Sequence, residues 1–557
     1  MPTVGRVTFA PVEGASDVFT PAFCDYVAHM HDVFAPRVAD ARGARASAAK
    51  DARRDLRLPS SPPTSSVNTE PWQVPPVPAE LRKPGIEITG PVSITNMFIN
   101  ALNPGPEGAR AEGDLDDDED SAGHRLIDTV RAAQNRTRAV EGGLSYHDAE
   151  RGRDYEVQPG ELPFFMHRER GLHLDEPEVT IDGKPVSAAI LGTALTLFHA
   201  GRAQAKAGQG IYFYLPKMES AEEAAFWRDF FAESQARVDH LRHAVIRGIP
   251  LIESLPAVDE MEEMLHALGP YAAGLNAARW DLKASILEFV MADPDMVWPD
   301  RFGVDIKTTA FLSDIFRRLV AVCLKHDAVA IGGMATALPS RDEEVNKAAA
   351  ASIRADKEWE AAQGFTRAWV AHIFHMGVAA EPFKELTDSG WQPTAEMADP
   401  DNYPIEIKRP EGEVTLEGTR RNLRTLIEYV EGWLGGRGAK GIDSLAGRPG
   451  LHPALMEDLA TARISVAQTG QRIIHAAKDA DTGEAHDLAL VKRVLLAEEE
   501  DIVANLEGAD EQTKGRYAQA TKVTMQWIKN YTEFDFRSLG SYTRDDLAAI
   551  AAAPDAI

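Results

Sequence analysis

The stretch that decides the fold runs from Ile211 to Glu253 and reads IYFYLPKMESAEEAAFWRDFFAESQARVDHLRHAVIRGIPLIE. It opens with the apolar run IYFYLPK (211–217) and closes with the apolar run GIPLIE (248–253). Residues 221–245 between them carry apolar side chains at helical spacing. A short buried strand, a helix and a second short buried strand, in this order, predict two parallel strands joined by a crossover helix.

The same alternation continues on both sides of this stretch. Short apolar runs recur between longer helical segments at 86–90, 109–115, 162–168, 211–217, 248–253, 271–277, 328–334 and 367–374. The run at 109–115 is the weakest, because acids interrupt it. Eight strands that alternate with helices predict the α/β class and a (β/α)₈ TIM barrel, in which catalytic groups stand at the carboxyl ends of several strands.

The segments before and after these runs have a different pattern. A chain of 557 residues is too long for one ordinary core, so further domains are expected. Residues 1–80 contain a long helical pattern followed by a linker rich in proline and serine, residues 81–385 hold the barrel, and residues 386–557 are helical. These three ranges are the predicted domains.

Composition limits the classes of function. The chain is 44% hydrophobic and 26% charged, and its formal net charge is −27, which argues against partners such as nucleic acid or anionic membranes. No run of 18 apolar residues is present, so no membrane span is expected. Cys24 and Cys323 lie far apart and are interpreted as buried or free thiols in a reducing compartment. The first residues lack the pattern of a signal peptide, so a cytoplasmic location is expected.

Polar side chains follow the predicted strands, where a barrel would bring them together. They are Asp114, Asp116, Asp117, Arg168, Lys217, Glu253 and Asp281. Simpler interpretations stay open for some of them. The acid run 114–120 is expected to be a solvated loop, as most charge runs are. Lys217 is equally well explained as a strand-end cation, and Arg168 and Arg170 as structural partners of Asp175 or Glu176.

Glu253 is harder to explain by structure alone. It follows Pro250, Leu251 and Ile252, which have the composition of a buried strand, and buried glutamate is rare unless it is paired or bound to metal. Glu253 and Asp281 would offer two carboxylates, which suits Mg²⁺ because this ion keeps several waters. No cluster of histidine and cysteine indicates zinc.

A second pair of acids, Glu457 and Asp458, stands near the C-terminus in LMEDLATARIS (455–465). The simplest interpretation is the N-terminus of a helix, where acids face the positive end of the macrodipole. A catalytic interpretation needs support from the rest of the chain.

That support comes from a resemblance. The motifs that carry this resemblance are PKMES (216–220), GLNAARWD (274–281) and LMEDLAT (455–461). In these motifs and their order, and from about Phe23 to about Ile474, the sequence resembles the malate synthase family, most closely its A-type form. The resemblance implies a TIM barrel with an N-terminal helical clasp and a C-terminal helical plug over the barrel mouth. It also implies a Mg²⁺-dependent Claisen condensation of acetyl-CoA with glyoxylate, followed by hydrolysis to malate and CoA.

The resemblance also assigns roles to residues. It implies metal ligands at Glu253 and Asp281, the active-site arginine at Arg168, and the catalytic base at Asp458. The backbone of Ala278, Arg279, Trp280 and Asp281 would cradle glyoxylate together with Arg168 and Glu253, and Pro339 would lie near the acyl-CoA. A base for a weakly acidic thioester methyl group must be well placed, and a fixed cation such as Arg168 would stabilise the enolate oxygen.

Some pocket loops depart from the family pattern. They include GPVSITNM (90–97), the segment after His372, and Arg463 beyond the predicted base. Three alternatives therefore remain: a related enzyme that condenses an acyl-CoA with another 2-oxo acid, a malyl-CoA-type lyase or thioesterase, and a binding protein with little turnover. The oligomeric state stays open.

Overall fold

The computed structural model describes residues 1–59, 61–443, 453–506 and 508–553. Its centre is a closed barrel of eight parallel strands, in which each strand pairs with the next along the chain and the last pairs with the first. The predicted TIM barrel is therefore confirmed. The strands are β3 (Gly85–Pro91), β4 (Gly113–Asp117), β7 (Phe164–Arg168), β10 (Ile211–Leu215), β11 (Ile246–Ile252), β12 (Gly274–Ala277), β13 (Val329–Ala335) and β14 (Arg367–Val370).

Strand β4 differs most from its predicted position. It begins at Gly113 and carries three acids, Asp114, Asp116 and Asp117, which are all buried. In the register of the barrel, Asp117 lies beside Arg168 of β7, and Arg168 lies beside Tyr214 of β10. The acids thus lie within the strand and next to basic neighbours, which is why apolar composition alone located this strand poorly.

Helices surround the barrel, and their ends follow local signals. In α8 (Ala221–Arg237), Ser220 accepts a hydrogen bond from the Glu223 amide, and acids fill the first turn. The other long helices of this layer are α5 (Leu126–Val140), α6 (Ala188–Phe198), α11 (Arg279–Phe289), α12 (Ala310–Lys325), α13 (Glu343–Gln363) and α14 (Met376–Asp388). Shorter helices α4 (Thr95–Leu102), α7 (Ala200–Ala207), α9 (Leu255–Asp259) and α10 (Met261–Leu268) complete it.

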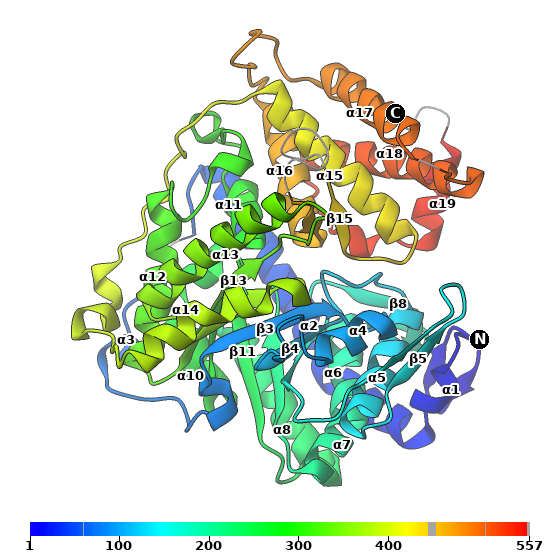
Figure 1. The fold of residues 1–557 in the computed structure, drawn as a ribbon, viewed down its shortest axis with the longest axis vertical. Coiled ribbons are helices and arrows are strands. Elements are labelled where there is room, and N and C mark those ends of the chain that lie inside the picture. The colour runs from blue at the N-terminus through cyan, green and yellow to red at the C-terminus, as the bar shows by residue number, and fades with distance from the viewer. Residues whose placement is uncertain (60, 444–452, 507, 554–557) are drawn as a thin grey trace.

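The C-terminal part lies above the barrel in Figure 1 and is helical, as predicted. Its helices are α15 (Leu416–Leu434), α16 (Leu459–Ile474), α17 (Leu488–Ala504), α18 (Glu511–Thr532) and α19 (Arg544–Ala552). One feature was not expected: β15 (Lys440–Ile442) and β16 (Leu455–Glu457) form a short antiparallel pair. Because β16 leads into α16, which packs on α11 of the barrel, it fixes the approach of the LMED segment.

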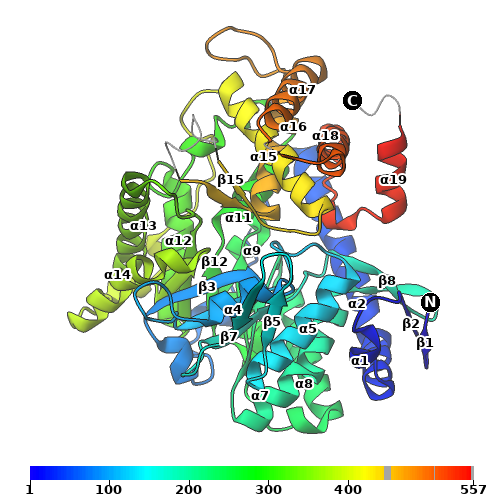
Figure 2. The ribbon, with the colours of Figure 1, turned by 45° about the vertical axis from the view of Figure 1, so that its right-hand side comes forward.

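The N-terminal part joins both regions. Helix α2 (Pro21–Asp55) begins at the Thr20 cap and runs along the barrel towards the C-terminal helices (Figure 2). Two short strands precede it, β1 (Thr3–Val4) and β2 (Val7–Phe9), and form a four-stranded antiparallel sheet with β8 (Asp175–Ile181) and β9 (Lys184–Ser187). These strands are an addition to the predicted helical segment. The predicted domain boundaries near residues 80 and 385 stay a prediction.

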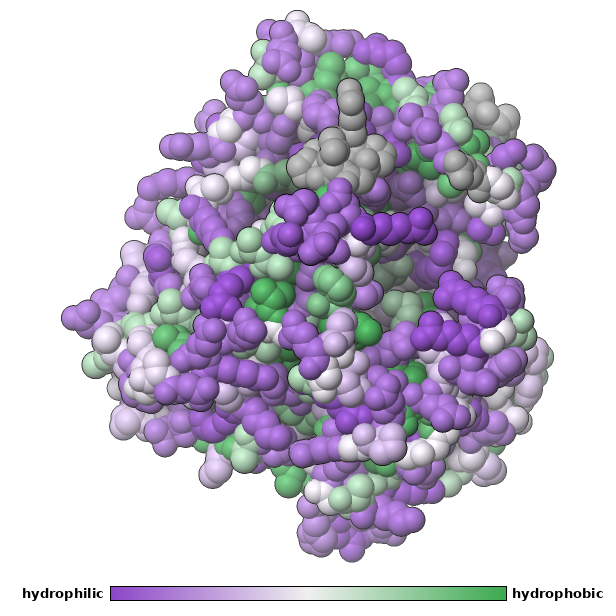
Figure 3. Space-filling model, viewed as in Figure 1, coloured by the Kyte–Doolittle hydropathy of each residue, from purple (hydrophilic) through white to green (hydrophobic). Residues whose placement is uncertain are grey.

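The hydropathy of the molecular surface in Figure 3 agrees with a chain in which 26% of the residues are charged. The face in Figure 3 is mostly hydrophilic, with hydrophobic residues in small groups. In the described part of the chain, no helix combines the length and the apolar character that crossing a bilayer requires. Cys24 and Cys323 are buried free thiols, as expected.

Candidate active site

Four predicted residues meet at the carboxyl ends of the barrel strands. Arg168, at the end of β7, is buried and donates two hydrogen bonds of 2.7 Å from Nε and Nη2 to the carboxylate of Asp117. Its third nitrogen, Nη1, lies 3.8 Å from carboxylate oxygens of Glu119 and Asp120. The guanidinium is thus clamped on one edge, while Nη1 is the nitrogen best placed to bind a further oxygen.

The acid run 114–120 is not a solvated loop, so that expectation was wrong. Its acids are at most 2% exposed. For Asp116 to Asp120 the physical reason is compensation by neighbouring strands and helices, which a charge run in the sequence does not reveal. Asp114 has no hydrogen-bond partner among the described residues, and burial holds its pKa well above the usual range. The partners are Arg136 and His167 for Asp116, Arg168 for Asp117, Thr129 for Asp118, and Lys217 for Glu119 and Asp120.

Lys217 is the centre of a buried carboxylate cluster. Its Nζ lies 2.7 Å from Asp281, 2.9 Å from Asp120, 3.1 Å from Glu119 and 3.6 Å from Glu253. Its backbone amide also donates a 2.5 Å hydrogen bond to Glu253 Oε1. Lys217 is therefore a member of the site, and the interpretation of a simple surface-seeking cation does not hold because the side chain is only 8% exposed.

Three acids of this cluster could hold a cation. Oxygen atoms of Asp120, Glu253 and Asp281 all lie within 4.8 Å of one another, which is close enough for one ion to contact all three. Oδ1 of Asp120 is buried and has no hydrogen-bond partner among the described residues. Glu253 and Asp281, the two predicted metal ligands, are thus brought together, and Asp120 joins them.

The electrostatics of the cluster favour a divalent cation. Burial raises the pKa of Glu253 to about 7, although Lys217 opposes the shift. Burial and the nearby Asp120 hold the pKa of Glu119 well above its usual range. In contrast, Lys217 and Arg463 outweigh burial and lower the pKa of Asp281 to about 2. Carboxylates that are this crowded gain from an added positive charge, so the residues present fit a metal ion.

Asp281 has a further partner that was not predicted as part of the site. Arg463 of α16 donates from Nη1 to Asp281 Oδ1 at 2.9 Å, and its other two donors bind Glu288. Glu288 in turn accepts a hydrogen bond from Tyr531. The C-terminal helices therefore contact a predicted metal ligand directly.

Asp458 lies where β16 ends and α16 begins. Its Oδ1 accepts hydrogen bonds from the amides of Ala460 (3.1 Å) and Thr461 (3.3 Å), so it is the cap of α16, as the simplest interpretation of the sequence suggested. It also lines, with Arg168 and Asp117, a hollow of about 30 Å³. Burial and the charge of Asp120 hold the pKa of Asp458 well above its usual range. Capping and a place at the site are therefore compatible.

The neighbouring acid, Glu457, has a different environment. It is buried and its carboxylate lies 3.8 Å from Arg301, within a network under the C-terminal helices. It does not line the hollow that Asp458 shares with Arg168. The structure thus separates two acids that the sequence could not distinguish.

The segment predicted to cradle the 2-oxo acid lies at the start of α11. Ala278 is the cap residue, and the amides of Arg279, Trp280 and Asp281 occupy the first turn, where helix geometry leaves N–H groups free for an anion. The Arg279 side chain points elsewhere, towards Asp356 and Glu360 at 3.2–3.4 Å. Only its backbone is therefore placed for binding at this turn.

The remaining predicted residue, Pro339, is exposed in the loop after β13. It does not line the hollow at Asp458, and its predicted role near the acyl-CoA stays untested. Asp120, Glu119 and Arg463 are the residues of the site that sequence reasoning missed. The one available signal was the acid run itself, because an acidic segment directly after a barrel strand enters the barrel mouth.

The fold and this polar cluster define a TIM-barrel protein with its candidate active site at the carboxyl ends of the strands, beneath a helical cover. Residues 164–405 match the family model described as "Malate synthase, TIM barrel domain", and residues 413–544 match "Malate synthase, C-terminal". The chain belongs to the malate synthase family.

Similar curated proteins extend over nearly the whole chain. It is 35% identical to malate synthase A of Escherichia coli (strain K12) over 86% of each chain. It is 35% identical to malate synthase of Myxococcus xanthus (strain DK1622), over 95% of this chain and 94% of the relative. It is 36% identical to malate synthase of Streptomyces clavuligerus over 97% of each chain. The resemblance inferred from the motifs is thus confirmed.

Proposed function

We propose that this protein is a malate synthase, which condenses acetyl-CoA with glyoxylate and hydrolyses the product to malate and CoA. The observation that carries the proposal is the convergence of Arg168, Asp458, Glu253 and Asp281 at one end of the barrel in a chain of this family.

Asp458 is the proposed base. It would take a proton from the acetyl methyl group, which leaves an enolate whose carbon attacks the aldehyde carbon of glyoxylate. The raised pKa of Asp458 makes it a better proton acceptor than an ordinary aspartate once it is ionised. Water then cleaves the thioester of the condensed product, and CoA leaves as the thiol.

Arg168 is the proposed partner of the enolate oxygen. Asp117 fixes two of its nitrogens, so the guanidinium needs little reorganisation as negative charge develops. Asp117 stays ionised, because Arg168 outweighs burial and brings the pKa of this acid to about 2. The same ion pair holds the charge of Arg168 at the shared hollow.

Glu253 and Asp281 are the proposed ligands of Mg²⁺, and Asp120 is a third candidate ligand. When bound, this ion would polarise the glyoxylate aldehyde and offset the charge of its carboxylate. The first-turn amides of α11 would bind the same carboxylate from the other direction. Lys217 holds these acids in place from the centre of the cluster.

Acetyl-CoA is the proposed thioester because the chain belongs to the malate synthase family. A cytoplasmic location is proposed together with this function.

The test is an assay for free CoA with acetyl-CoA and propionyl-CoA against glyoxylate, pyruvate and 2-oxobutyrate, with and without Mg²⁺. We expect Mg²⁺-dependent release with acetyl-CoA and glyoxylate. Release only with another pair would indicate a related condensing enzyme. Cleavage of malyl-CoA without condensation would indicate the lyase or thioesterase alternative, and no reaction with any pair would leave a binding protein.

A further inference from the structure

A cavity of about 510 Å³ reaches the carboxylate cluster from the side of the C-terminal helices. Its walls come from α2, from α11 and α16, and from the end of α18 with the segment that follows. Its floor includes Lys217, Glu253 and Asp281, which are at most 8% exposed. The cavity, called here the side chamber, shares no lining residue with the hollow at Asp458.

Three arginines of α2 and α16 line the side chamber, and two of them form ion pairs with acids. Arg45 binds Glu223 with two hydrogen bonds of 2.6 Å. Arg463 binds Asp281 and Glu288. No hydrogen bond or ion pair joins the third arginine, Arg53, to any residue within the described ranges.

The guanidinium of Arg53 packs against aromatic rings, and burial lowers its pKa although the charge of Glu288 opposes the shift. Its guanidinium lies 4.9 Å from the ring centre of Phe536 and 5.6 Å from that of Phe534, and both rings line the side chamber. Its Nη1 is buried and has no hydrogen-bond partner. An arginine that packs against aromatic rings and has no acid partner can bind a carboxylate, since the guanidinium fork fits this group.

A second polar group is also unused. The ring of His173 lines the same chamber, and its Nδ1 is buried without a hydrogen-bond partner. Arg53 and His173 are thus two lining residues of the side chamber that each have a buried nitrogen without a hydrogen-bond partner in the described chain.

We infer that the side chamber is the entry and binding site for the small carboxylate anion of the reaction, and that Arg53 captures it. This inference rests on the proposed function, in which a 2-oxo acid enters and a hydroxy dicarboxylate leaves. The side chamber reaches Asp281 directly, whereas Asp281 is not among the residues that line the hollow at Asp458.

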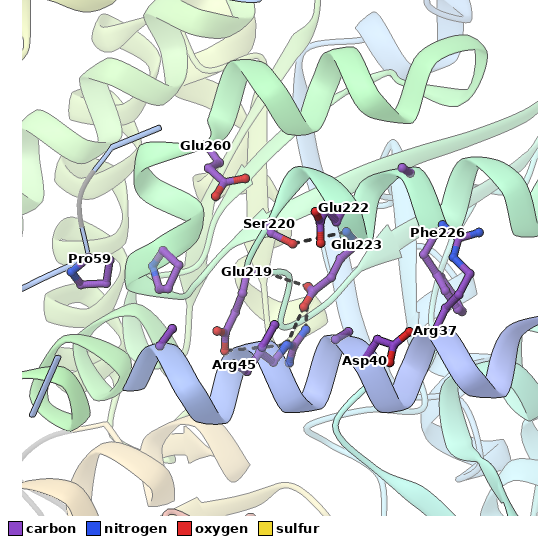
Figure 4. A pocket seen from close by; sticks show the side chains of 15 residues that line it. Arg37, Asp40, Arg45, Pro59, Glu219, Ser220, Glu222, Glu223, Phe226 and Glu260 are labelled. Atoms are coloured by element: carbon purple, nitrogen blue, oxygen red, sulfur yellow. Dashed lines mark hydrogen bonds and ion pairs between the residues drawn. The ribbon is translucent and has the colours of Figure 1, made fainter. Parts of the chain in front are cut away.

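A second pocket, which also has Arg45 in its wall, is the alternative route by which the anion could enter. Figure 4 shows this pocket between α2 and α8, where Arg45 and Glu219 form the wall that it shares with the side chamber. Four glutamates and Asp40 line it, against Arg37 and Arg45. This acidic pocket has more carboxylates than arginines and repels anions. The side chamber also has four carboxylates, but five cationic side chains line it, among them Arg53 and the exposed Arg537. The anion therefore enters past Arg53.

The experiment compares Arg53→Met with the parent enzyme in steady-state kinetics at low salt. Methionine keeps the packing of the long side chain against the rings and removes the charge. We expect kcat/KM for glyoxylate to fall roughly tenfold, with KM for acetyl-CoA unchanged. Raising the salt from about 20 to about 300 mM should slow the parent more than the variant. Arg53→Lys should restore part of the loss.

Two further variants complete the test. Arg54→Gln removes the same charge one residue away, from an exposed side chain paired with Asp51 and Asp55, and should leave both constants unchanged. Ala49→Trp would fill the side chamber and should also lower kcat/KM for glyoxylate, or weaken product inhibition by malate if the product leaves this way. The inference is overturned if Arg53→Met and Ala49→Trp both stay within twofold of an active parent. An inactive parent would instead contradict the proposed function.

Discussion

Replacement of Asp458 by asparagine separates the two roles that the structure gives this residue. Oδ1 of Asp458 caps α16 by accepting from the amides of Ala460 and Thr461. Asparagine caps a helix about as well as aspartate, so the helix should persist. The negative charge that would accept the proton is lost.

The two effects differ in size. Loss of a general base lowers turnover by about 10²–10⁴-fold, which corresponds to about 2.7–5.5 kcal/mol of activation free energy. The free energy of unfolding should stay within about 0.5 kcal/mol of the parent or increase. An increase is expected at neutral pH because burial and Asp120 raise the pKa of Asp458, so the folded state disfavours its charge.

Two assays measure the catalytic effect. Release of free CoA reports turnover, and exchange of the acetyl-CoA methyl protons into heavy water, with pyruvate as an unreactive stand-in, reports proton removal alone. Glu457→Gln is the matched control, because it changes the adjacent acid, which faces Arg301. It should keep turnover within about threefold and leave the unfolding free energy within about 1 kcal/mol of the parent, because burial raises the pKa of Glu457 as well. An Asp458→Asn protein with parental exchange and CoA release would refute the assignment of the base.

The remaining predictions concern Arg168, the carboxylate cluster and the dependence of stability on pH. Arg168→Lys cannot reproduce the two bonds to Asp117 and should lower kcat by ~10²-fold with little change in acetyl-CoA affinity, as measured by steady-state kinetics and equilibrium binding. Asp120→Asn should weaken Mg²⁺ binding roughly tenfold by titration calorimetry without changing circular dichroism; unchanged affinity would remove Asp120 from the metal site. His124 accepts a hydrogen bond from Trp433 Nε1, and burial lowers its pKa to about 4. Its contribution to stability is therefore complete above about pH 6.5 and is lost as the pH falls to about 4, by up to ~3 kcal/mol in urea unfolding, whereas His124→Asn should flatten this dependence.

The sequence by itself determined the barrel and the identity of its main polar residues. The alternation of short apolar runs and helices is a local property of the sequence, so it can be recognised without knowledge of tertiary contacts. The eight barrel strands could be predicted from it. Glu253 could be singled out because it directly follows a buried strand. The motifs around Asp281 and Asp458 then indicated the malate synthase family, which the similar proteins confirm.

Only the tertiary structure decided how those residues are compensated. Asp117 and Asp120 were expected to be solvated because their partners, Arg168 and Lys217, stand about 50 and 100 residues further along the chain. Asp120 enters the carboxylate cluster and Arg463 reaches Asp281 only after the helices close over the barrel. Charge pairing depends on distance in space and on burial, and neither is encoded in the local order of residues.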